Sequence, residues 1–139
     1  RAIYDHDRIP PSILTKQRAK SADVCCAACS AGAEFYEVVP ASGEAIFDKH
    51  SYSAFVGTGL ADWLRARELR SPIFTGVQTN GCVEASLRDA VRRGFYCTIA
   101  ADCVASHSPA LHDATLANTA ALMGDVFSSD EIVSHWAGV

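Results

Sequence analysis

One stretch of the sequence decides the fold: Pro72-Ile73-Phe74-Thr75-Gly76-Val77-Gln78-Thr79-Asn80-Gly81-Cys82-Val83-Glu84. Residues 72–75 predict a short buried strand, and residues 76–81 predict a turn. From Val83 onward, apolar residues recur at the spacing of one helical face, and Gly94 ends that helix. On its other face, residues of opposite charge stand four apart: Glu84 with Arg88, and Asp89 with Arg93. The stretch therefore predicts a strand, a tight turn and a helix in direct succession.

Strands and helices alternate over the rest of the chain. Further strands are expected at residues 12–15, 45–47, 95–101 and 126–127. Further helices are expected at residues 1–7, 57–64, 108–123 and 128–136, with residues 21–32 as a loop or a loose helix. This alternation indicates an α/β protein with a mainly parallel sheet. Ligands of such sheets bind at the carboxyl ends of the strands, which groups Lys49, the turn 78–82 and the loop 102–107 at one edge.

Length and composition describe one soluble globular domain over residues 1–139. Hydrophobic residues make up 49% of the chain and charged residues 20%, which is enough for a packed core. The net charge of -4 provides no basic face for nucleic acid, and no apolar run reaches the roughly 20 residues that span a membrane. The chain has six cysteines among long periodic segments, which indicates free thiols in a reducing, cytoplasmic setting.

Cys82 is the candidate nucleophile. It follows a strand and a turn at the start of a helix, where the helix N-terminus carries partial positive charge and free backbone N–H groups. Both features favour the thiolate, which is the reactive form of cysteine. The same N–H groups can hold the oxyanion of a tetrahedral intermediate. The alternative is that Cys82 is only a small buried hydrophobic residue.

Lys49 is the candidate partner of this thiol. It is expected at the carboxyl end of the strand 45–47, in a chain that has only three lysines. A lysine at that position stabilises a nearby thiolate and can transfer protons. The alternative is an ordinary exposed lysine at the end of a strand.

Two separated motifs carry a resemblance to a known family. Residues 76–84, GVQTNGCVE, resemble the nucleophile turn of the isochorismatase-like cysteine hydrolases, whose pattern is roughly GVxTNxCV. Residues 48–60, DKHSYSAFVGTGL, resemble the K-x-x-x-SAF-x-GT-x-L segment of the same family. The resemblance covers residues 40–136 and implies a three-layer α/β/α fold around a Rossmann-like parallel sheet.

The resemblance also implies a chemistry, that of a cysteine-dependent amidohydrolase similar to N-carbamoylsarcosine, ureidoacrylate and maleamate amidases. The family uses a triad of Asp, Lys and Cys, which assigns Lys49 and Cys82. It places a cis peptide bond between Val77 and Gln78, and an oxyanion hole at the backbone N–H groups of Gln78 and Cys82. A small amide, ureido or N-carbamoyl substrate would form a thioester with Cys82 and release ammonia or an amine. No cofactor is implied, and a homo-oligomer is expected.

Two further residues are candidates for binding the substrate. Related hydrolases often have an arginine in the loop after the next strand, where this chain has His107 in the loop 102–108. His107 can bind an anion when protonated, and an exposed loop histidine is the equal alternative. Phe55 can line the pocket, although an aromatic residue at such a position is more often part of the core.

The chain departs from the family pattern in two places. The aspartate of the triad lies on a first strand that has no match here, so we hypothesise that residues before Arg1 or another chain supply it. Nicotinamidases hold a metal with Asp and His residues, but residues 16–47 contain no histidine, so no such metal site is expected. The cysteines 25, 26 and 29 lack a second pair of ligands and are read as small-residue packing.

Three other functions remain open from the sequence. The missing aspartate suits a catalytically silent family member that serves as a binding or scaffold subunit. Isochorismatase activity is a second alternative, and it needs no thiol. The number of cysteines suits a redox-sensing protein in which Cys103 resolves an oxidised Cys82.

Overall fold

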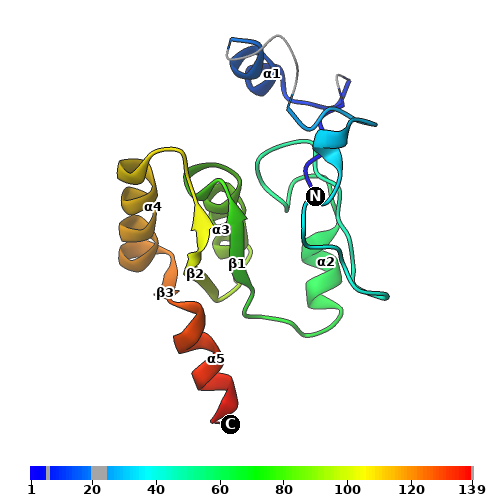
Figure 1. Cartoon of the computed structure of the whole chain (residues 1–139). Helices are drawn as coiled ribbons and strands as arrows, with labels where there is room; N and C mark the ends of the chain where they lie inside the picture. Colours follow the sequence, from blue (N-terminus) through cyan, green and yellow to red (C-terminus); the bar gives the residue numbers. More distant parts are fainter. Residues whose placement is uncertain (6, 20–24, 139) are drawn as a thin grey trace. The chain divides into compact units, whose positions relative to one another are not determined.

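The computed structural model describes residues 1–5, 7–19 and 25–138, and the chain forms two compact units, Arg1–Gly59 and Leu60–Val139 (Figure 1). The helices are α1 (Pro11–Arg18), α2 (Leu60–Arg65), α3 (Glu84–Arg92), α4 (Pro109–Leu122) and α5 (Ser129–Ala137). The strands are β1 (Ile73–Val77), β2 (Cys97–Ala105) and β3 (Gly124–Phe127). Two shorter turns are a 3-10 turn, η1 (Ala31–Ala33), and a π-helical turn, η2 (Thr79–Val83).

The second unit is built on a parallel sheet of three strands in the order β1-β2-β3. Helix α3 connects β1 to β2, and α4 connects β2 to β3, so each parallel pair is joined by a helical crossover (Figure 1). The register pairs Ile73 with Thr98 and Cys97 with Gly124. The predicted α/β fold with a parallel sheet is confirmed in this unit.

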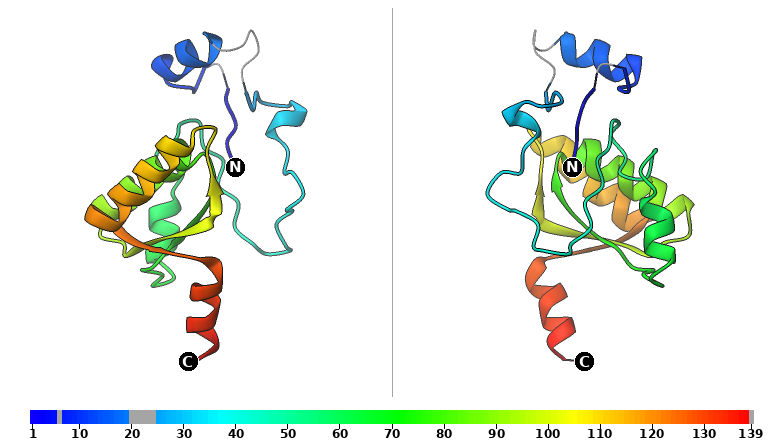
Figure 2. Two further views of the ribbon diagram at one scale, coloured as in Figure 1. Left: turned by 60° about the vertical axis from the view of Figure 1, so that its left-hand side comes forward. Right: turned by 90° about the vertical axis from the view of Figure 1, so that its right-hand side faces the viewer.

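Helices cover both faces of this sheet. Helices α3 and α4 lie on one face (Figure 2), where Leu87 and Ala90 of α3 and Ile99 of β2 have no exposed surface. Successive residues of a strand point to opposite faces, so Thr98 points to the other side, where Ile132 of α5 lies beside it. The predicted arrangement of helix, sheet and helix layers is confirmed.

The helix ends follow the capping signals of the sequence. Ser108 caps α4 by accepting a hydrogen bond from the backbone N–H of Leu111, at 3.4 Å. Ser128 caps α5 in a capping box with Glu131, whose carboxylate accepts the Ser128 N–H at 2.7 Å. Both predicted ion pairs of α3 are present as well, Arg88–Glu84 at 2.7 Å and Arg93–Asp89 at 3.3 Å.

The strand β2 is longer at its C-terminal end than the sequence indicated. It continues to Ala105, so Asp102 lies inside the strand rather than in the predicted loop 102–107. Asp102 accepts hydrogen bonds from the hydroxyl and the backbone N–H of Ser129, at 2.5 and 2.7 Å. These bonds hold the pKa of the Asp102 carboxyl below its ordinary value. A polar residue thus continues the strand because the start of α5 satisfies its carboxylate.

Gly124 makes the closest backbone approach in the sheet. A β-carbon at this position would lie 2.1 Å from the carbonyl oxygen of Cys97 on β2. We therefore expect Gly124→Ala to lower the free energy of unfolding by about 1–3 kcal/mol, the usual cost of overpacking. Gly138→Ala is the matched control, because its β-carbon would make only ordinary contacts, the nearest at 3.7 Å. Chemical denaturation of both variants checks this, and equal stability of the two would contradict the close approach.

The first unit differs from the sequence-based expectations in three segments. Residues 1–5 are not part of a helix, although a helix was predicted over residues 1–7, of which residue 6 lies outside the described residues: Ala2 and Tyr4 form single parallel bridges with Lys49 and Ala27. The predicted strand 12–15 lies inside α1, because Pro11 occupies the first turn of a helix, where its missing N–H costs nothing. The segment 21–32 was predicted as a loop or a loose helix and is not one of the differences: residues 21–24 lie outside the described residues, and residues 25–30 form turns that lead into η1.

The third difference concerns the strand predicted at residues 45–47, which the structure does not form. Ile46 is half exposed, and within the described residues the only ladder contact nearby is the bridge between Lys49 and Ala2. An apolar run of three residues becomes a strand only when a neighbouring strand takes up its backbone hydrogen bonds. Lys49 therefore does not stand at the end of a strand, which corrects that part of the prediction.

The packed part of the first unit is a small cluster of Tyr4, Ile9 and Ile13, each at most 9% exposed. Ala2, Leu14 and Cys26 pack against it. This cluster fixes the start of the chain against α1. No helix among the described residues is long and apolar enough to cross a membrane.

Candidate active site

The turn that carries Cys82 begins inside β1. Gly76 has a φ of 102°, a backbone conformation that residues with a β-carbon rarely adopt, and the sheet register shifts between Phe74 and Gly76. The peptide bond between Val77 and Gln78 is cis, at the position that the family resemblance implied. Glycine and the cis bond together lead the chain out of the sheet and into η2.

Cys82 lies within η2, immediately before α3. The backbone N–H groups of Gly81 and Val83 both donate to the carbonyl of Gln78, at 3.0 and 3.2 Å. The hydroxyl of Ser86 donates to the carbonyl of Cys82 at 2.6 Å, and the Cys82 side chain is half-buried. Gln78 and Cys82 thus belong to one hydrogen-bonded turn at a helix start, the setting in which an oxyanion hole was predicted.

Three polar side chains that follow β2 are bonded to this turn and to the first residue of α3. His112 bonds Thr79 at 2.9 Å, Ser106 donates to Asn80 at 2.6 Å, and Thr115 donates to Glu84 at 2.8 Å. Sequence reasoning missed all three. The spacing of His112, Thr115 and Thr119 on one helical face was the available signal, since these polar residues recur where apolar ones were expected.

Lys49 lies in the first unit, and its ammonium group is held by the chain that follows it. It donates to the carbonyl of Ser51 at 2.8 Å and to the carbonyl of Tyr52 at 2.9 Å. The neighbouring Asp48 is paired with the Arg1 guanidinium at 2.9 Å, and this hydrogen bond holds the pKa of the Asp48 carboxyl below its ordinary value. Lys49 is thus oriented locally, while its role beside Cys82 stays a prediction.

The two predicted substrate-binding residues differ in exposure. Phe55, in the first unit, is only 6% exposed, and its backbone N–H donates to the hydroxyl of Ser53 at 3.1 Å. His107, in the second unit, lies exposed in the short loop between β2 and α4. His107 is exposed just beyond the carboxyl end of β2, a position from which a side chain can bind a ligand. The burial of Phe55 fits both of its predicted roles, a residue of the core and a residue that lines a pocket.

The other thiols differ from Cys82 in their surroundings. Cys97 is buried in β2, and this burial raises the pKa of its thiol to about 11. Cys103 lies exposed on the same strand, and all six cysteines are free thiols. Cys97 therefore stays protonated at neutral pH, and Cys103 is the exposed reference thiol of the second unit.

In residues 1–5, 7–19 and 25–138, no group of three or more His, Cys, Asp or Glu side chains is placed to hold a metal ion. The sulfur atoms of Cys25 and Cys26 lie 3.4 Å apart, but Cys29 does not complete a site with them.

A protein-family model described as the isochorismatase domain matches residues 8–131. The chain belongs to the isochorismatase family. This match includes the turn around Cys82, Lys49, Phe55 and His107.

Named relatives of this isochorismatase-family chain are amidohydrolases. A ureidoacrylate amidohydrolase of Methylorubrum extorquens is 39% identical over 90 residues, which are 63% of this chain and 36% of the relative. A maleamate amidohydrolase of Pseudomonas putida is 34% identical over 104 residues, 73% of this chain and 49% of the relative. The chain thus spans between about a third and a half of the length of these relatives.

The fold of the isochorismatase family is also found by structural comparison. The crystal structure of an isochorismatase-like hydrolase from Alkaliphilus metalliredigens superposes with a TM-score of 0.85 at 20% identity. The superposition covers 97% of this chain and 70% of the other. The parallel sheet flanked by helices is therefore the isochorismatase-like fold.

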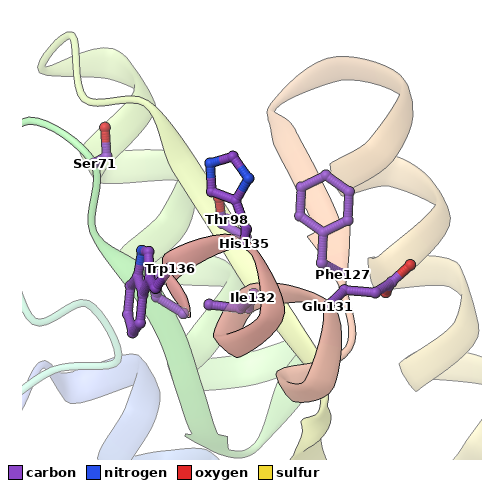
Figure 3. Close-up of a pocket in the computed structure, with 8 residues that line it drawn as sticks. Ser71, Thr98, Phe127, Glu131, Ile132, His135 and Trp136 are labelled. Carbon is purple, nitrogen blue, oxygen red and sulfur yellow. The ribbon is translucent and has the colours of Figure 1, made fainter. Parts of the chain in front are cut away.

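A pocket of about 470 Å³ lies between α5 and the sheet of this isochorismatase-family chain (Figure 3). Its walls are mostly apolar and consist of Ser71, Ile73, Thr98, Phe127, Glu131, Ile132, His135 and Trp136. None of the predicted site residues lines it. The pocket is therefore separate from the candidate active site, which is defined by the turn at Cys82.

Proposed function

We propose that this protein is a cysteine-dependent amidohydrolase that cleaves a small amide, ureido or N-carbamoyl substrate. The observation that carries the proposal is the turn η2, in which Cys82 directly precedes α3 and the hydroxyl of Ser86 donates to the Cys82 carbonyl. That position offers the thiol to solvent-borne substrate and surrounds it with the backbone N–H groups of a helix start. The amidohydrolase relatives support the same reaction class.

The proposed reaction is acyl transfer through a thioester. The sulfur of Cys82 attacks the carbonyl carbon, and the backbone N–H groups of Gln78 and Cys82 stabilise the oxyanion. Ammonia or an amine leaves, and water hydrolyses the thioester. Lys49 favours the thiolate through its positive charge, and the resemblance implies an aspartate for the proton transfers, a role to which we assign no residue of this chain.

The substrate is proposed from the relatives together with the chemistry of the turn. The relatives are named for ureidoacrylate and maleamate, which are both small acyclic molecules with a terminal amide or ureido group. His107, exposed after β2, is the proposed contact for an acidic group of the substrate.

A screen for ammonia release tests this function. The full chain is incubated with ureidoacrylate, maleamate, N-carbamoyl amino acids and nicotinamide, with the Cys82→Ala variant as the control, and isochorismate is assayed in parallel. Release of ammonia by the wild type but not by the variant supports the proposal. Turnover of isochorismate alone favours the isochorismatase alternative, and no turnover of any compound favours a catalytically silent member.

Selective alkylation of Cys82 is a second expected result. At neutral pH we expect iodoacetamide to modify Cys82 about tenfold faster than an ordinary exposed thiol, which is mostly protonated at that pH. Cys103 serves as the internal reference because it is exposed, and Cys97 reacts last because it is buried with a raised pKa. Peptide mapping by mass spectrometry measures the three rates. Equal alkylation rates at Cys82 and Cys103 would contradict this expectation, because Cys82 would then be no more reactive than an ordinary exposed thiol.

A further inference from the structure

The nucleophile turn is attached to α4 by side chains that are distant in sequence. Nδ1 of His112 and the hydroxyl of Thr79 form a hydrogen bond of 2.9 Å between residues 33 positions apart. The hydroxyl of Ser106 donates to the side-chain oxygen of Asn80 at 2.6 Å, in the next position of the turn. The hydroxyl of Thr115 donates to Glu84 at 2.8 Å, one turn of α4 beyond His112. Three residues of the segment 79–84, namely Thr79, Asn80 and Glu84, are thus held by hydrogen bonds from the loop after β2 and from α4.

Burial makes the bond at Thr79 different from a surface contact. Thr79 has no exposed surface, and Thr115 is only 2% exposed. A buried hydroxyl group that loses its hydrogen-bond partner destabilises the folded state, because it is neither solvated nor paired. The bond to His112 therefore holds Thr79 in its position. Asn80 and Ser106 are half-buried, so their bond is more easily replaced by water.

Thr79 also holds a special place in the geometry of the turn. Thr79 is the first residue of η2 and lies three residues before Cys82. It directly follows Gln78, whose peptide bond to Val77 is cis. Any displacement of Thr79 moves both backbone N–H groups that were assigned to the oxyanion hole. Errors of about 1 Å in such positions lower catalytic rates by about 10²-fold.

We propose that His112 is a positioning residue, which fixes Thr79 and through it the relative placement of the Cys82 sulfur and the oxyanion hole. This inference rests on the proposed function and deepens it. His112 touches neither the substrate nor the reacting atoms, and it acts through a hydrogen bond to a residue of the turn. Loss of the bond between His112 and Thr79 therefore lowers the rate of the chemical step, while the affinity for the substrate stays nearly unchanged.

The test uses matched pairs of variants in the full chain. His112→Leu and Thr79→Val remove the hydrogen bond with little change in volume, whereas His112→Asn and Thr79→Ser keep a polar group near the same place. His135→Leu is the control, because His135 lies on α5 beside the separate pocket. The measurements are kcat and KM on the amide found in the screen, together with the melting temperature of each variant.

We expect His112→Leu and Thr79→Val each to lower kcat about 10–100-fold with KM changed less than about threefold, and the double variant to be no worse than either single one. His112→Asn and Thr79→Ser should recover most of the rate, and His135→Leu should keep it. Unchanged kcat in His112→Leu overturns the proposal, and so do additive losses in the double variant. A loss of kcat that only follows the melting temperature, without rescue by His112→Asn, also overturns it.

The alkylation rate of Cys82 separates this inference from the proposed function. If the wild type hydrolyses no amide, the proposed function fails, and the positioning role is then judged by iodoacetamide labelling. An at least fivefold change in the Cys82 rate relative to Cys103 in both His112→Leu and Thr79→Val, restored in His112→Asn, supports it. The same Cys82 rate in all variants overturns it whatever the reaction of the protein is.

Discussion

We expect the Cys82→Ala variant to hydrolyse amides at least about 10³-fold more slowly than the wild type, because removing a covalent nucleophile leaves only binding and oxyanion stabilisation. The fold should be unaffected, since the side chain is half-buried and its replacement is smaller. Steady-state ammonia release, measured at several substrate concentrations, gives kcat/KM for both proteins.

The matched control for this variant is Cys103→Ala, which removes an exposed thiol of the same unit. Its activity should equal that of the wild type. If Cys82→Ala retains more than about a tenth of the wild-type rate, the thiol is not the nucleophile, and a water-based mechanism such as that of an isochorismatase becomes the better account. Equal losses in both variants would indicate a role for several thiols, as in a redox sensor.

The second large effect is expected at Lys49. In Lys49→Met, loss of the ammonium group should lower kcat by about 10²-fold or more, the usual contribution of a positioned acid–base group. The same variant should alkylate Cys82 more slowly, because the positive charge that favours the thiolate is gone. Methionine keeps the length of the side chain, so the variant tests the charge rather than the packing.

Lys16→Met is the control, because Lys16 is an exposed lysine of α1 in the same unit as Lys49. Its activity and its Cys82 labelling should be unchanged. The melting temperature must be compared as well, since Lys49 donates to the carbonyls of Ser51 and Tyr52 and its loss leaves both without this donor. Full activity in Lys49→Met, with wild-type labelling of Cys82, would contradict its assignment.

The sequence allowed most of the second unit to be predicted, because its signals are long and mutually consistent. The amphipathic helix α3 (Glu84–Arg92) is followed two residues later by Gly94, and Ser108 and Ser128 mark helix starts by capping hydroxyls. The fold class and the position of the turn at Cys82 follow from these local signals, whereas the layers were implied by the resemblance to the family. The strand ends were predicted less well: β1 runs on to Val77, β3 already begins at Gly124, and β2 continues past Asp102, whose carboxylate bonds to the distant Ser129.

The first unit was harder to predict, and the reasons are physical. Its apolar runs are only three or four residues long, which is too short to distinguish the period of a helix from that of a strand. The segment 12–15 became helical because of Pro11. The segment 45–47 stayed irregular because, among the described residues, only single bridges such as that of Ala2 with Lys49 pair this part of the chain. Single bridges between distant residues leave no pattern in a sequence.

The candidate site shows the same division between local and distant contacts. Cys82, Gln78 and the cis bond at Val77 lie within one motif and could be assigned from it. The bond between His112 and Thr79 spans 33 positions and required coordinates. Residue types in a motif therefore predict the reacting groups, while hydrogen bonds to the turn from distant residues are found only in the folded chain.

Trapping the reaction intermediate shows whether the substrate becomes covalently bound to the sulfur of Cys82. The wild type is mixed with an amide that it hydrolyses, and the reaction is quenched in acid within a single turnover. The protein is then digested, and the peptide that contains Cys82 is analysed by mass spectrometry. We expect an acyl group of the substrate on Cys82, absent from Cys103 and absent when Cys82→Ala is treated in the same way. Turnover without an adduct on Cys82, or an adduct on another residue, would contradict it.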